Sequence, residues 1–292
     1  MAGSGNIPPL PPPDSSLPPV LSAPPTLAVA DANPTGGQRR RAVALGLGLV
    51  VILFVALTPW PLDAKLRLVG AACCAQAPTR TLSFGGQAMP LDARDAGLYL
   101  TLLLALGAAV VVGRGRSAHW PPRPLLALLG GLFVAMVVDG INSTLQTRGL
   151  HAFYPTTNPI RVLTGAGAGL ALAVLGLPLV NRVVWRTPED EAVLEDYTEL
   201  AGFVIVAVVA VAVLLASRAW LYYPLSLLST LGVLVGWGLV NAVVVTVATR
   251  REQRAVTGRD AALLLLAGVA LTLCEVAVID LARHATTLAI SH

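Results

Sequence analysis

Residues 225–248 read "LSLLSTLGVLVGWGLVNAVVVTVA", a continuous apolar run without a charged side chain. A helix needs about 20 mostly apolar residues to cross the hydrocarbon core of a bilayer, so this run predicts a transmembrane helix. The whole chain has the same bias, because 55% of its residues are hydrophobic, only 12% are charged and its mean hydropathy is +0.73. Leu, Val and Ala dominate and aromatic residues make up 5%, which favours a helical bundle over a porin-type barrel.

Further runs of comparable length predict further spans. The predicted spans are residues 42–58, 96–113, 124–139, 161–180, 201–217, 225–248 and 261–282. The predicted fold is therefore all-α, a polytopic transmembrane helical bundle of about seven spans. Small residues recur in the fourth and sixth spans at spacings that let helix backbones approach closely. These residues are Gly165, Gly167, Gly169, Gly232, Gly236 and Gly238.

The chain divides by composition into three regions. Residues 1–38 are rich in Pro, Ser, Ala and Gly, and we predict a disordered tail because their few apolar side chains cannot offset chain entropy. The tail has no basic segment followed by an apolar one, so it does not resemble a signal peptide. This tail could be a simple linker, or its prolines could form a polyproline ligand for a partner domain, and both interpretations are open. Residues 39–180 then hold four predicted spans, and residues 181–292 hold three.

Basic residues indicate the orientation. Counting Lys and Arg on alternate sides of the predicted spans gives twelve on one side (residues 39–41, 114–123, 182–186 and 250–259) and eight on the other (residues 65–94, 148–161, 218 and 283). Cytoplasmic loops carry the excess, so we expect a multi-pass protein of the cell membrane with a cytoplasmic N-terminus. The basic residues form short clusters between apolar runs, so a pI near 9.3 does not indicate nucleic-acid binding.

One further helix start is predicted between the fourth and fifth spans. Thr187 is a suitable N-cap, Pro188 suits the first helical position, and acidic residues follow in the first turn. We therefore expect a helix that runs from Thr187 into the fifth span.

Polar residues gather on the side opposite the N-terminus. The loop of residues 59–95, the loop between the third and fourth spans and the end of the seventh span all lie on this outward side by parity. The charged residues that we single out there are Arg80, Asp92, Arg94, Asp95, Asp139 and Arg161. A charge at membrane depth costs about 2.5–3.5 kcal/mol unless it is paired or hydrated. We therefore predict that Asp139 and Arg161 form an ion pair, either as a structural clasp or as part of a site.

Three segments carry a resemblance to a known family. They are "CCAQAPTRTLSFGGQAMPLDARDAGLYL" at residues 73–100, "VVDGINSTLQTRG" at 137–149 and "TNPIRVLTGAGAG" at 157–169. Over about residues 45–180 the chain resembles the membrane proteins grouped as domain of unknown function 2085. The matching positions are Cys74, Gln76, Pro78, Arg80, Pro90, Leu91, Arg94, Gly97, Tyr99, Asp139, Gly140, Asn158, Arg161, Thr164 and Gly165. The resemblance implies a membrane location but no activity.

The chain departs from that family at three positions. Ala75 replaces a His, and Asp92 and Asp95 replace the two cysteines of a Cys-x-Arg-Cys motif. A closed zinc or iron–sulfur site wants four nitrogen or sulfur ligands, so we predict no such metal centre and no cofactor. The Asp-x-Arg-Asp turn instead favours a cap on the second span. Its carboxylate pair could also serve a cation of the Mg, Ca or Mn type, a basic partner or Arg80.

Glu275 lies well inside the seventh predicted span. A carboxylate at that depth is by default a functional hypothesis, such as a proton relay, an ion site or a charge partner. The structural alternative is a group that is protonated or hydrogen-bonded to Asn241 or Thr246 of the sixth span. Both interpretations are open at this stage.

Three classes of function remain. The leading one is a non-enzymatic membrane protein that binds a ligand or a protein partner through the outward polar cluster. Its expected partners are the lipid bilayer and either another membrane protein or further copies of itself in a homo-oligomer. The second is a proton, cation or small-solute transporter that uses Glu275 and Asp280, although no internal repeat supports it. The third is a membrane-embedded enzyme acting on a lipid or envelope substrate. The chain has no hydrolase, Walker or dinucleotide motif in the required context, which disfavours the enzyme.

Overall fold

The computed structural model describes residues 57–290. It is mostly helical, with six helices long and apolar enough to cross a membrane. These are α3 (Ala93–Val111), α4 (Arg123–Thr147), α5 (Asn158–Val184), α6 (Tyr197–Leu215), α7 (Tyr222–Ala248) and α8 (Gly258–Ile290). They confirm the second to seventh predicted spans as helices. The predicted tail, and the first predicted span except for its last two residues, lie outside the described residues.

The shorter elements correct the expectation of a purely α-helical fold. They are helix α2 (Leu62–Cys73), two 3-10 turns at Pro78–Arg80 and Ala219–Leu221, and strands β1 (Thr81–Phe84), β2 (Gln87–Asp92), β3 (Ser117–His119) and β4 (Glu189–Ala192). Strands β1 and β2 pair antiparallel, whereas β3 and β4 pair in parallel. Two small sheets therefore lie among the connections between the long helices.

Two glycines make the β1–β2 hairpin. Gly85 and Gly86 have φ angles of +58° and +84°. A two-residue turn with positive φ at both positions matches the twist of antiparallel strands, and only glycine adopts it without strain. The register pairs Phe84 with Gln87 and brings Thr81 opposite Asp92. Residue Asp92 is thereby placed at the end of β2, directly before α3.

The start of the fifth predicted span differs from the expectation. The segment after Thr187 forms β4, because Glu189 donates from its backbone N–H to the Arg116 carbonyl and so pairs with β3. Helix α6 begins instead at Tyr197, where the Asp196 side chain accepts a hydrogen bond from the Glu199 N–H. The helix predicted to start at Thr187 is therefore wrong.

Helix α3 packs against α5, α6 and α7, and α5 is its closest partner. A Cβ added at Gly165 would lie 2.0 Å from the Arg94 carbonyl oxygen, and one at Gly169 would lie 2.2 Å from the Leu98 oxygen. These clashes show that the two backbones approach as closely as glycine allows. Helix α4 contacts α5 but presents apolar side chains such as Val134 and Ile141 outward, as expected of a lipid-facing helix.

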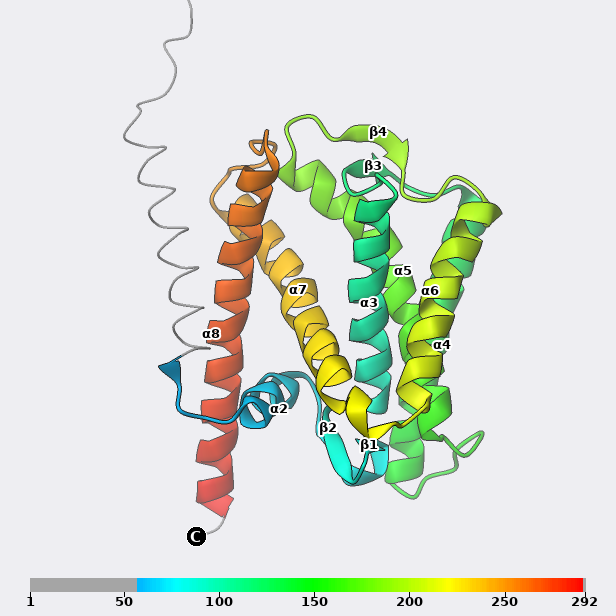
Figure 1. Cartoon of the computed structure of the whole chain (residues 1–292), viewed down its shortest axis with the longest axis vertical. Coiled ribbons are helices and arrows are strands. Elements are labelled where there is room, and N and C mark those ends of the chain that lie inside the picture. Colours follow the sequence, from blue (N-terminus) through cyan, green and yellow to red (C-terminus); the bar gives the residue numbers. More distant parts are fainter. Residues whose placement is uncertain (1–56, 291–292) are drawn as a thin grey trace, which may run out of the picture. The chain divides into compact units, whose positions relative to one another are not determined.

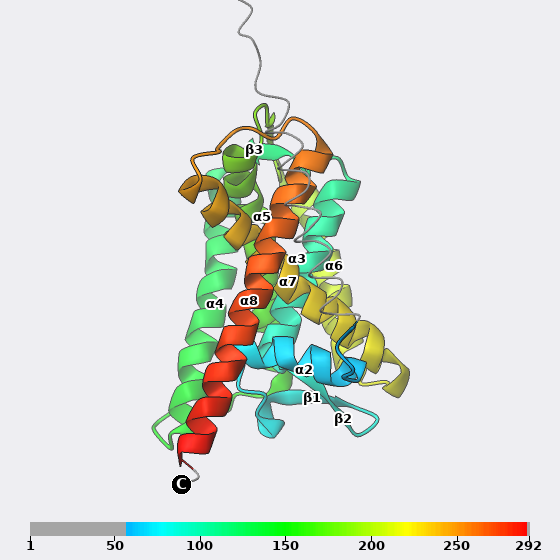
Figure 2. The same cartoon turned by 90° about the vertical axis from the view of Figure 1, so that its left-hand side faces the viewer.

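The connections lie at two opposite ends of the long helices (Figures 1 and 2). The hairpin end holds β1, β2, the loop of residues 148–157 and the start of α5, and α2 lies across α7 and α8 near it. The β3–β4 end holds the two parallel strands and the α7–α8 connection. The residues predicted on the outward side by span parity lie at the hairpin end.

Candidate functional site

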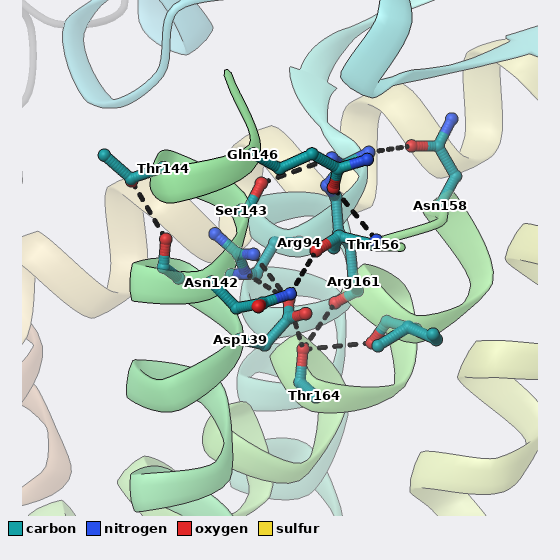
Figure 3. Close-up of polar contacts among 12 residues, drawn as sticks. Arg94, Asp139, Asn142, Ser143, Thr144, Gln146, Thr156, Asn158, Arg161 and Thr164 are labelled. Atoms are coloured by element: carbon teal, nitrogen blue, oxygen red, sulfur yellow. Dashed lines mark hydrogen bonds and ion pairs between the residues drawn. The ribbon is translucent and has the colours of Figure 1, made fainter. Parts of the chain in front are cut away.

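Asp139 is the centre of a hydrogen-bond network at the hairpin end (Figure 3). Its side chain is fully buried and accepts from Arg94 at 2.5 Å (Nη2) and 3.2 Å (Nε). The Tyr154 hydroxyl donates to its other oxygen at 2.9 Å, and the Thr164 hydroxyl lies at 3.3 Å. Burial and the bond to Asp139 raise the pKa of Tyr154, which keeps this donor protonated. The network joins α3, α4, α5 and the 148–157 loop.

The predicted ion pair between Asp139 and Arg161 is wrong. Asp139 pairs with Arg94, which is on the first turn of α3. The close α3–α5 contact at Gly165 brings that turn beside α5. Gly140 also leaves room for the guanidinium, since a Cβ there would lie 3.7 Å from Arg94 Nη1. The alternation of the spans places Arg94, Asp139 and Arg161 at the same end of the helices. The rotation of each helix about its axis then determines which arginine contacts Asp139.

Arg161 makes its hydrogen bonds with neutral groups. Its side chain donates to Asn158 Oδ1 at 2.9 Å and to Ser143 Oγ at 3.2 Å. The residue is only 8% exposed, and its Nε is buried without a hydrogen-bond partner among residues 57–290. The positive charges of Arg80 and Arg94 act on it, opposed by Asp139 and Asp92. Arg161 is therefore a buried cation without a carboxylate in ion-pair contact, within the described part of the chain.

Side-chain amides and hydroxyls form further hydrogen bonds around Arg94 and Arg161. Asn142 donates to the Tyr154 carbonyl at 2.8 Å and to Thr156 Oγ1 at 2.9 Å, and it accepts from the Phe153 N–H at 2.8 Å. Gln146 accepts from the Thr156 N–H at 3.0 Å. These bonds hold the 148–157 loop against α4. Arg80 donates to Thr147 at the end of α4.

The Asp-x-Arg-Asp turn lies at the start of α3, where the prediction placed its negative charges. Asp92 is at the N-cap position of α3 and Asp95 is in the first turn, yet the Asp92 side chain makes no cap hydrogen bond. It accepts from the Thr81 hydroxyl at 3.2 Å. One donor atom each from Cys74, Asp92 and Asp95 lies within 4.8 Å of the others. The turn therefore brings two carboxylates to a cysteine rather than to Arg80.

Most of the hairpin end falls within a segment that matches a known family model. Residues 74–175 match the model of DUF2085, described as a predicted membrane protein. This segment of the chain belongs to the DUF2085 family. Comparisons with curated proteins and with solved structures give no match. The DUF2085 segment is narrower than the range expected from the motifs, and it contains every singled-out residue of the hairpin end from Arg80 to Arg161.

Glu275 lies outside the DUF2085 segment and away from the arginines. It accepts a hydrogen bond from Asn241 Nδ2 at 2.8 Å, and the same amide lies 3.0 Å from Thr272 Oγ1. The Asn241 contact agrees with the structural alternative, whereas Thr246 bonds to its own helix at the Ala242 carbonyl. Glu275 also lines a pocket of about 480 Å³ with residues of α2, α7 and α8.

Sequence reasoning singled out neither Ser143 nor Tyr154. Ser143 could have been found, because Asp139, Asn142, Ser143 and Gln146 repeat at the i, i+3, i+4 and i+7 spacing of one helix face. That spacing required α4 to extend past Asp139, where the predicted span ended. Tyr154 is in an irregular loop, and no sequence period points to it.

Proposed function

We propose that this chain is a multi-pass membrane protein that binds a small anionic ligand at the hairpin end of its DUF2085 segment. The ligand class is a carboxylate or a phosphate. Arg161 is the main binding residue, Arg80 assists it, and the Arg94–Asp139 pair positions the helices around them. The observation that carries the proposal is the buried Arg161 guanidinium with only neutral hydrogen-bond partners.

The physical argument concerns the cost of a buried charge. A buried ion without a counter-ion loses hydration and gains little in return, so buried arginines normally contact carboxylates. Here Asp139, the carboxylate predicted to pair with Arg161, already accepts hydrogen bonds from Arg94, Tyr154 and Thr164. An anion contacting Arg161 would supply the missing charge. The planar fork of arginine matches carboxylate and phosphate oxygens, which makes these the expected ligands.

The proposal is tested by measuring how the Tm of the full chain, purified in detergent, depends on the anion present. A ligand that binds only the folded state at 100 times its Kd stabilises it by about 2.7 kcal/mol. We expect phosphate or a small carboxylate to raise the Tm of the wild-type protein, compared with chloride at equal ionic strength. Arg161→Gln should lose this response. Arg148→Gln, which removes an exposed arginine at the same end, should keep it.

Two results would overturn the proposal. One is a wild-type Tm that does not respond to any carboxylate or phosphate beyond the chloride control. The other is an equal response in Arg161→Gln, which would place the anion elsewhere. Arg161→Lys refines the assignment, because it keeps the charge but loses the planar fork, and we expect a weaker response from it.

We further propose that the hairpin end faces outward, with about seven spans including residues 42–58 and a cytoplasmic N-terminus. The support is the charge count of twelve to eight. The native Cys73 and Cys74 are poor probes, because Cys74 is buried and its hydrogen bond with Cys73, together with burial, raises the pKa of the Cys73 thiol. Gln87→Cys, exposed on β2, should react with an impermeant thiol reagent in intact cells, and Glu252→Cys at the other end should react only after lysis. The reverse pattern would contradict this orientation.

A second candidate function has one supporting observation. The pocket of about 480 Å³ carries Glu275 and Thr272 on its wall, so a proton or cation could reach a carboxylate within a spanning helix. Asp280, the other carboxylate named for transport, is not among the described residues that line this pocket. If Glu275 carries protons, Glu275→Gln in proteoliposomes should abolish pH-gradient dissipation, whereas Arg161→Gln should not. Equal fluxes in wild type and Glu275→Gln would exclude this function.

A further inference from the structure

Cys74, Asp92 and Asp95 converge from three different elements. Cys74 follows the last residue of α2, Asp92 ends β2, and Asp95 is in the first turn of α3. One donor atom from each, the sulfur and two carboxylate oxygens, lies within 4.8 Å of the others. Cys74 and Asp92 are each only 9% exposed. The three side chains therefore form one cluster of metal-ligand types beneath the hairpin.

No Lys or Arg side chain among residues 57–290 forms an ion pair with the cluster, although the charges of Arg94 and Arg161 act on Asp95 and Asp92 from beyond contact distance. The Asp92 carboxylate is only 9% exposed, and it accepts one side-chain hydrogen bond, from Thr81 to Oδ1. Asp95 makes no hydrogen bond or ion pair in the same part of the chain, and Arg94, between them in sequence, is paired with Asp139. Two carboxylates this close and this poorly hydrated disfavour each other's ionisation, and a cation bound between them would relieve that repulsion.

The backbone around the cluster is held firmly. A Cβ at Gly70 would lie 2.0 Å from the Pro90 carbonyl oxygen, so α2 and β2 are in direct backbone contact. Gln76 bridges them as well, since its Nε2 donates to the Pro90 oxygen at 2.7 Å and to the Arg67 oxygen at 2.8 Å. The Cys74 thiol donates to the Gly70 carbonyl oxygen of α2 at 3.1 Å. The donors are thus presented by a scaffold that does not depend on a metal to assemble.

We infer that Cys74, Asp92 and Asp95 bind one divalent transition-metal ion. One sulfur and two carboxylate oxygens suit a borderline ion such as Zn²⁺ or Co²⁺. At metal–ligand distances of about 2.0–2.3 Å, tetrahedral ligand atoms lie about 3.6 Å apart. Small side-chain rotations would bring the three donors to that spacing. Three protein ligands leave at least one position for water or an exogenous ligand.

This site differs from the metal centre that sequence analysis argued against. That expectation concerned a closed site with four nitrogen or sulfur ligands, for which Asp92 and Asp95 are unsuited. An open site with three mixed ligands has other requirements, which the geometry meets. The site is also separate from the proposed anion site, because neither Arg161 nor Arg80 contributes a donor to it. Failure of either proposal leaves the other standing.

Cobalt binding tests the inference, because Co²⁺ bound to a thiolate shows a near-ultraviolet charge-transfer band. The probe is CoCl₂ alone, titrated into the full chain after purification in detergent and removal of metals with a chelator. We expect one Co²⁺ per chain with the thiolate band. Cys74→Ser should lose the band, and Asp92→Asn or Asp95→Asn should weaken binding at least about tenfold. Cys73→Ser and Cys274→Ser should keep both the band and the affinity.

Folding is checked independently of the metal. Each variant should elute from size exclusion as the wild type does and keep its far-ultraviolet circular dichroism without Co²⁺. The inference is overturned if wild-type protein takes up no stoichiometric Co²⁺, or if the band survives in folded Cys74→Ser. It is also overturned if folded Asp92→Asn and Asp95→Asn bind as tightly as wild type. In that case the two carboxylates share a proton instead.

Discussion

The two ends of the long helices use arginine differently. At the β3–β4 end, Arg114 contacts three carboxylates, those of Glu191 at 2.7 Å, Glu195 at 2.9 Å and Glu199 at 3.0 Å. These ion pairs also raise the pKa of Arg114. At the hairpin end, Arg161 contacts only an amide and a hydroxyl. The first arrangement is complete within the chain, whereas the second leaves a positive charge for something else to neutralise.

Two other arginines of the β3–β4 end bond to neutral groups, as Arg161 does, but neither of them is buried. The Arg116 guanidinium lies 4.2 Å from the centre of the Trp185 ring, which accounts for its Nε lacking a hydrogen bond. Arg182 donates to the Ala118 carbonyl at 2.7 Å. Each of these arginines joins two segments of the connections. Arg161 therefore differs from these arginines in being buried, and from Arg114 in having no carboxylate partner among the described residues.

The largest effect is expected from breaking the buried ion pair of the hairpin end. Asp139→Ala leaves Arg94 unpaired beside a buried site, which should lower the free energy of unfolding by about 3–5 kcal/mol. A double-mutant cycle with Arg94→Gln, measured by unfolding in mixed micelles, should show coupling of about 1–3 kcal/mol. The same cycle with Arg161→Gln should show less. Equal coupling with Arg161 would restore the pair that the sequence predicted.

A smaller loss is expected where α3 meets α5. Gly169→Ala would place a methyl group 2.2 Å from the Leu98 carbonyl oxygen, so the helices must separate. Overpacking of this kind costs about 1–3 kcal/mol. Gly131→Ala, on the outer part of α4 with no atom within 4 Å of its added methyl, is the matched control and should not destabilise the protein. Similar losses in both variants would show that helix propensity, not the close contact, decides.

The smallest effect is expected at the β3–β4 end. Arg114→Gln removes three ion pairs, but the glutamate side chains are 59%, 55% and 34% exposed. Solvent screens such pairs, so we expect a loss of about 1 kcal/mol or less, which shrinks further at high salt. A loss as large as that of Asp139→Ala would make this cluster the principal electrostatic clasp of the fold.

The six described spans could be predicted because hydropathy and length alone decide them. The β1–β2 hairpin could also have been found, since Gly85 and Gly86 between Phe84 and Gln87 form a two-residue turn signal. The helix start at Thr187 failed because local capping propensity was overridden by the pairing of β4 with β3.

The candidate site was only partly predictable. Span parity correctly grouped Arg94, Asp139 and Arg161 at one end. Their pairing depends on helix rotation and on the α3–α5 distance set by Gly165, which no spacing within a single span reveals. The meeting of Cys74 with Asp92 and Asp95 likewise required the hairpin to fold the chain back on α2.

In the proposed function, Arg161 binds a ligand and does not stabilise the fold. The most direct test compares the unfolding free energies of Arg161→Gln and Arg94→Gln in ligand-free protein. Removing an unpaired buried charge relieves its desolvation, and Gln can still bond to Asn158 and Ser143, so Arg161→Gln should match wild type within about 0.5 kcal/mol. Arg94→Gln leaves Asp139 buried without its partner and should lose about 3 kcal/mol or more. An equal loss in both variants would contradict the claim and make Arg161 a structural residue.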